Sequence, residues 1–89
     1  MLRSKKAAAL KYIQGEDAAP RVVAKGRGYI AEKIIEAAKA NDVPIHEDPN
    51  LTQMLEALEL DAEIPVELYR AVAEVLAFVY RLNRKIERK

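Results

Sequence analysis

Few side chains of this 89-residue sequence could take part in covalent chemistry. Nucleophilic catalysis needs a nucleophile held beside a general base, and the sequence has one serine, Ser4, one histidine, His46, and no cysteine. Ser4 stands at the start of the sequence, so a catalytic triad is not expected. His46 precedes Glu47 and Asp48, but adjacent residues lack the spacing that converges on a metal ion. We expect no enzyme activity, no metal and no cofactor.

A pair of glycines in Lys25-Gly26-Arg27-Gly28 precedes a predicted helix. Backbone N–H groups at a helix start attract anions, which would suit a phosphate site. Neither the Walker spacing nor G-x-G-x-x-G is present, and glycines also serve a tight turn from a strand into a helix. We interpret the motif as such a turn.

The composition is typical of one small globular domain. Hydrophobic residues make up 51% of the sequence and charged residues 33%, so there is enough apolar surface to offset the entropy of folding. The absence of cysteine fits a reducing compartment, and no apolar run approaches the length of a membrane span. We expect a cytoplasmic protein that associates with a membrane only through other proteins.

The charges are unevenly distributed along the sequence. Residues 1–39 carry nine basic and four acidic side chains, residues 40–79 one basic and nine acidic, and residues 80–89 five basic and one acidic. This pattern leaves two interpretations open: a head-to-tail dipole, or solvated faces of a domain. No aromatic residues interleave the basic C-terminus, so nucleic-acid binding is not expected.

The first half of the sequence predicts a hairpin followed by a helix and a strand. Residues 7–13 and 21–25 have strand character and flank a cluster of turn residues. An amphipathic helix is predicted over 29–40. Residues 43–47 are predicted to form a third strand, which would make a right-handed parallel crossover.

The second half predicts two helices. Asp48 and Pro49 are typical of a helix start, and Ile64-Pro65 precedes a long helix. The face of that helix predicted to pack inward consists of Tyr69, Val72, Ala73, Leu76, Val79 and Tyr80. The fold class is α/β: a small mixed sheet of about three strands packed by about three helices, in a single domain over 7–82. Residues 1–6 are predicted to be a flexible basic N-terminus and 83–89 a basic tail.

Five segments, in order, resemble the FlhB family of type III secretion export proteins. They are 9–12, 19–28, 43–49, 63–65 and 68–80, and the most specific are A-P-R-V-V-A-K-G at 19–26 and A-V-A-E-V-L-A-F-V-Y at 71–80. The likeness is to the C-terminal cytoplasmic domain. It implies a flagellar or type III protein-export component that binds export substrates or apparatus proteins.

Family members carry an Asn-Pro-Thr-His motif just before the strand that matches residues 7–12, and the resemblance implies that its asparagine cleaves the chain. The matching positions are Leu2, Arg3, Ser4 and Lys5. Leucine has no side-chain nitrogen to cyclise, so we expect no self-cleavage. The strand that precedes the motif in the family also has no match here.

The resemblance places a substrate-receiving apolar patch at Ala19, Pro20, Ala73 and Leu76. An alternative is structural, because Ala73 and Leu76 lie on the predicted core face and Pro20 could end a turn. The edge of the strand over 7–13 could accept a strand from another chain or form a homodimer. A charge-driven regulator or assembly factor, not involved in substrate gating, is the competing function.

Overall fold

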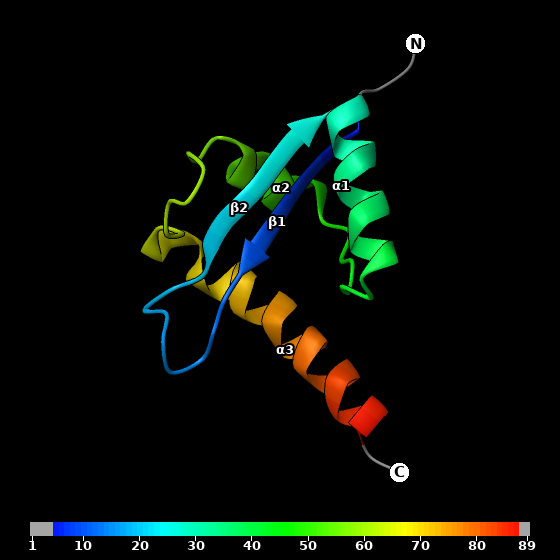
Figure 1. Ribbon diagram of the computed structural model, residues 1–89. Helices are drawn as coiled ribbons and strands as arrows, with labels where there is room; N and C mark the ends of the chain where they lie inside the picture. Colours follow the sequence, from blue (N-terminus) through cyan, green and yellow to red (C-terminus); the bar gives the residue numbers. More distant parts are fainter. Residues whose placement is uncertain (1–4, 88–89) are drawn as a thin grey trace.

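The computed structural model describes residues 5–87, with side chains to Arg81. Along the chain come β1 (Lys6–Lys11), β2 (Arg21–Arg27), α1 (Tyr29–Ala40), α2 (Pro49–Glu56), the 3-10 turn η1 (Val66–Leu68) and α3 (Tyr69–Glu87). Figure 1 shows α1 and α2 on opposite faces of the two strands, with α3 crossing beyond one end of the strands. Within this range no helix is long and apolar enough to cross a membrane. Expectations for residues 1–4 and for the side chains of the 83–89 tail lie outside the described residues.

The two strands form an antiparallel hairpin, as predicted. The register pairs Lys6 with Arg27 and Ala9 with Ala24, then shifts so that Leu10 pairs with Val22. Val23 is the extra residue of this bulge and is 41% exposed. β1 ends two residues earlier than predicted, because the Ile13 carbonyl accepts the N–H groups of a tight turn.

The predicted third strand over 43–47 is wrong, and with it the parallel crossover. The described residues form a two-stranded sheet, because the end of α1 and the proline leave little backbone for pairing. Asp42 adopts φ 58°, and the Val43 N–H donates to Ala38 O at 2.8 Å, which closes the helix end. Pro44 has no N–H to offer a ladder. The segment instead links α1 on one face to α2 on the other.

A segment far along the chain takes the place beside β2. The Val22 N–H donates to Ala62 O at 3.1 Å, and the Val22 carbonyl accepts the Asp61 N–H at 2.7 Å. The Ile64 N–H donates to Pro20 O at 2.9 Å. These bonds fix the start of α3 against the start of β2.

The predicted helices are confirmed. α1 has the predicted bounds, and Asp48 caps α2 by accepting the Leu51 N–H at 3.1 Å, with Pro49 at the first position. The long helix after Pro65 begins through the short turn η1 and continues as α3.

The main core lies between β2, α2 and the start of α3. Its buried members are Ala19, Val22, Leu51, Leu55, Ile64, Leu68 and Val72. The predicted inward face of α3 is partly wrong. Val72 is buried, but Tyr69 and Tyr80 are 46% and 61% exposed, and Ala73 is exposed. Half-buried Val75 and Leu76 complete the contact with the core.

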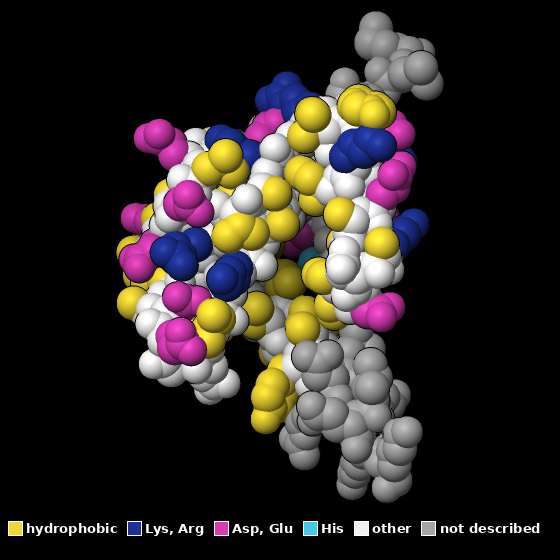
Figure 2. Space-filling view, in the orientation of Figure 1, with side chains coloured by type: hydrophobic (Ala, Val, Ile, Leu, Met, Phe, Trp, Pro, Cys, Tyr) yellow, Lys and Arg dark blue, Asp and Glu magenta, His cyan; other side chains and the backbone are white. Residues whose placement is uncertain are grey.

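The charges do not form a single-sign surface on the visible side of the molecule. Figure 2 shows basic and acidic side chains interspersed there. Segments of opposite charge in the sequence therefore lie side by side in space, which favours solvated faces over a head-to-tail dipole on this side.

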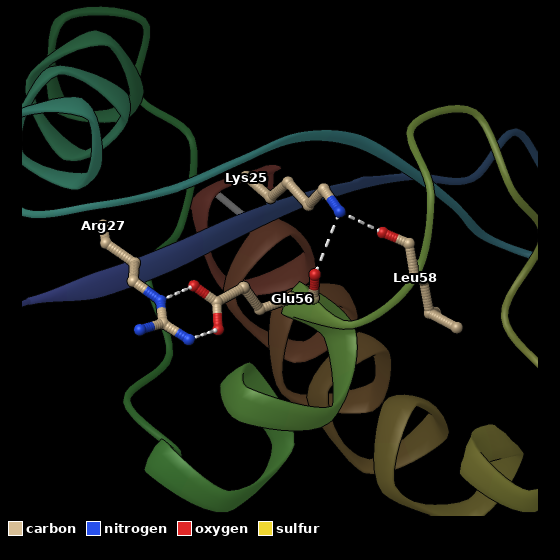
Figure 3. A network of polar contacts seen from close by, with 4 residues as sticks. All are labelled: Lys25, Arg27, Glu56 and Leu58. Carbon is tan, nitrogen blue, oxygen red and sulfur yellow. Dashed lines mark hydrogen bonds and ion pairs between the residues drawn. The ribbon is translucent and has the colours of Figure 1, made fainter.

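Lys25 and Arg27 hold α2 against the sheet (Figure 3). The Lys25 amine donates to Glu56 O at 3.0 Å and to Leu58 O, where helix carbonyls lack partners. Arg27 meets the Glu56 carboxylate with two hydrogen bonds, one from Nη2 at 2.9 Å and one from Nε. The hydrogen bond from Arg27 holds the pKa of Glu56 below its ordinary value, and the charges of Arg27, Lys6 and Lys25 act in the same direction, against partial desolvation. One strand thus anchors the end of α2 at two points.

The close approach of α1 to β2 predicts the effect of Gly26→Ala. An added Cβ would lie 2.7 Å from the Ile30 Cβ and still closer to Cγ2. We expect a loss of about 1–3 kcal/mol in the free energy of unfolding, measured by urea denaturation. Ile30→Ala removes Cγ2 but keeps the Cβ at 2.7 Å, so in that background Gly26→Ala should cost less stability than it does in the wild type, without becoming neutral. A Gly26→Ala protein as stable as the wild type would contradict the packing.

The Arg27–Glu56 pair predicts a pH dependence. A lowered Glu56 pKa stabilises the fold above the ordinary glutamate pKa, and the contribution disappears as pH falls through the lower, folded-state value. Glu56→Gln should therefore lose stability near pH 7, while its difference from the wild type shrinks near pH 3. Urea denaturation at both pH values checks this. Equal differences at the two pH values would show that the ionised carboxylate contributes nothing.

Candidate protein-binding groove

An open apolar groove of about 250 Å³ lies where three parts of the chain meet. Residues 18–20 form one wall, the first two turns of α3 form the other, and Ile64 lies between them. Tyr12, just after β1, and Tyr69, at the start of α3, also line it. Among the side chains that the structure describes, no acidic, basic or histidine side chain lines this groove.

The groove contains all four residues of the predicted patch. The structure brings together two parts of the chain that are more than fifty residues apart in sequence: Ala19 and Pro20 before β2, and Ala73 and Leu76 on α3. Ala19 is 3% exposed and belongs to the core, and Pro20 is buried with its carbonyl bonded to Ile64. Ala73 is exposed and Leu76 half-buried. The packing alternative therefore describes Ala19 and Pro20, while Ala73 is accessible to a partner.

The loop beside the groove is held by Asp17. Its carboxylate accepts the Ile13 N–H at 2.7 Å, and the Ile13 carbonyl accepts the Asp17 N–H at 2.8 Å. Arg21 lies 3.8 Å from the same carboxylate. These contacts hold the turn between Tyr12 and Ala18, the two groove residues that flank it.

Two tyrosines were not predicted as groove residues. Tyr69 lies one helical turn before Ala73, so the i, i+4 spacing on α3 could have indicated it. Tyr12 belongs to a different element, and only the fold brings it to α3. Tyr12 and Tyr69 are 40% and 46% exposed, so each ring offers apolar area to the groove and to solvent.

The chemical character of the groove lining is that of a binding surface. The described lining residues are aliphatic and aromatic, and the tyrosine hydroxyls are the only side-chain polar groups among them. Among the described residues, no cluster of three metal-ligating side chains occurs. An apolar pocket with few polar groups is typical of a site that accepts an apolar side chain of a ligand.

Comparisons with known proteins agree on one family. The model of the FlhB HrpN YscU SpaS family matches residues 4–79. The protein YlqH of Bacillus subtilis is 44% identical over 85 residues, which cover 96% of this chain and 91% of YlqH. The flagellar biosynthetic protein FlhB of Aquifex aeolicus is 44% identical over 81 residues.

The likeness to FlhB concerns part of that protein. The match covers 90% of this chain but 23% of Aquifex FlhB. The crystal structure of the cytoplasmic domain of FlhB from Shewanella putrefaciens superposes with a TM-score of 0.85 at 38% identity, covering 92% of this chain and 64% of that one. The sequence resemblance and the fold are thereby confirmed, and the chain belongs to the FlhB HrpN YscU SpaS family of export proteins.

Proposed function

We propose that this chain serves flagellar or type III protein export by binding an apolar segment of an export substrate or apparatus protein in the groove. The observation that carries the proposal is the convergence of Ala19, Pro20, Ala73 and Leu76 on one open apolar surface. Membership of the FlhB HrpN YscU SpaS family supports protein export as the process in which the chain takes part. The chain acts by binding, without catalysis, at the cytoplasmic face of the export apparatus.

The dimensions of the groove suit a side chain better than a whole domain. A volume of about 250 Å³ is below the range of about 300–1,000 Å³ for drug-sized ligands. It can receive one or two large apolar side chains, and the exposed rings of Tyr12 and Tyr69 can cover them. The expected ligand is therefore a short segment with an aliphatic or aromatic anchor.

Gating by this protein rests on binding alone, because the chain is not processed. The resemblance aligns Leu2 with the asparagine at which family members are cleaved, and leucine has no side-chain nitrogen to cyclise. Intact-mass spectrometry of the protein purified from its native host should show an uncut bond between Leu2 and Arg3 after prolonged incubation. A product that has lost residues 1–2 at that bond would contradict this.

Ala73→Asp tests the groove without disturbing the core. Ala73 is an exposed groove residue on α3, so the fold should persist in the variant. An apolar segment bound there would have to bury the new carboxylate, which costs desolvation free energy. We expect binding to purified rod or hook subunits of the native host to weaken about tenfold or more, measured by titration calorimetry. Pro20→Asp is less suitable, because Pro20 is buried.

The matched control is Ala37→Asp, which places the same charge at an exposed alanine on α1. This control should bind as the wild type does, with little change in affinity between low and physiological salt. Equal affinity of Ala73→Asp and the wild type would exclude the groove. A contact that weakens steeply with salt would favour the charge-driven regulator instead.

A further inference from the structure

The outer edge of β1 presents backbone groups for pairing. The Gly28 N–H donates to Lys5 O at 2.7 Å, which makes Lys5 and Gly28 a hydrogen-bonded pair of the hairpin. Hydrogen-bonded positions alternate along an antiparallel strand. Ala7 and Ala9 therefore direct their backbone groups to β2, and Lys6 and Ala8 direct theirs away from it. No described backbone group of residues 5–87, and no described side chain up to Arg81, bonds to this outer edge.

The surface beside the outer edge of β1 is hollowed. In Figure 2 the surface is hollowed between the strands and α1, on the side of β1. The middle of β1 consists of Ala7, Ala8 and Ala9, whose methyl groups take up little of that space. The nearby connection from α1 to α2 adds no ladder bond to the edge, since its backbone makes none with either strand in the described chain.

We propose that the outer edge of β1 accepts an extended strand of another protein, with acidic residues at the ends of that strand. Lys5 precedes β1 and Lys11 ends it, and because they are six residues apart their side chains point to the same face of the sheet. A second copy pairing antiparallel about Ala8, whose backbone groups face outward, would place Lys5 opposite Lys11, and like charges directly opposite are destabilising. Basic residues at both ends oppose self-pairing and favour carboxylates on the incoming strand. The alanines between them admit β-branched side chains as cross-strand neighbours.

This surface is separate from the groove. Strand addition uses main-chain hydrogen bonds for affinity and flanking side chains for selectivity, whereas the groove receives an apolar side chain. The sequence left a homodimer as the competing use of this edge, and the two lysines disfavour that use.

Amide hydrogen exchange of the full chain, followed by NMR, tests the proposal. The probe is a synthetic peptide, Glu-Val-Thr-Val-Thr-Val-Glu, with a control peptide that has lysine at both ends. The amides of Lys6 and Ala8 should exchange rapidly in the free protein and about tenfold more slowly with the acidic peptide at about ten times its Kd. The amides of Ala7 and Ala9, which face β2, should be protected in both states and serve as internal references.

Three results would overturn the proposal. The first is exchange at Lys6 and Ala8 that the acidic peptide leaves unchanged. The second is equal slowing by the lysine-ended peptide. The third is protection of both amides without peptide that increases with protein concentration, which would show that copies pair with each other.

Ala8→Pro provides an independent test, because proline removes an N–H that faces away from β2. Proline is tolerated on edge strands, so the hairpin should persist and the acidic peptide should no longer bind. Binding equal to that of the wild type would contradict strand addition. Should this variant fail to fold, the exchange measurement on the wild type decides.

Discussion

β2 is the strand on which every other element depends. Its first residues bond to β1 on one side and to the 61–64 segment on the other, so Val22 is buried with its backbone satisfied by residues far apart in sequence. Gly26 admits Ile30 of α1 on one face. Lys25 and Arg27 hold the end of α2 on the other. A small domain has little surplus stability, and this concentration of contacts on seven residues replaces a larger sheet.

The groove also depends on the position of β2. Residues 18–20 reach α3 because the Pro20 carbonyl accepts the Ile64 N–H, which places the start of η1 and α3 beside the start of β2. Ala19 and Val72 are then buried in the core, while Ala73, on the next helical position, stays exposed. A surface built on rigid elements in this way is ready for a ligand before the ligand arrives, which reduces the entropic cost of binding.

Local patterns were sufficient to predict most elements of this fold. The periodicity of 29–40, the Asp48-Pro49 helix start and the turn residues between the strands each act within a few residues, so the sequence indicates them directly. The 43–47 segment has strand-like residues, but its pairing depends on which backbone lies nearby, and a helix end and Pro44 determined the outcome. The prediction of the inward face of α3 was partly wrong for a related reason. Helical periodicity identifies an apolar face, but it does not say how much of that face the rest of the domain covers, and Tyr69, Ala73 and Tyr80 stay exposed.

The candidate site was predictable only through the family resemblance. No local pattern connects Ala19 with Leu76, and Tyr12 joins them through the fold alone. The most direct test of the central claim is an NMR titration of the labelled protein with a purified rod or hook subunit. The account predicts that the largest chemical-shift changes fall on the amides of 18–20 and 69–76, around the groove. Changes confined to the charged faces of α1 and α2, with the groove amides unmoved, would contradict it.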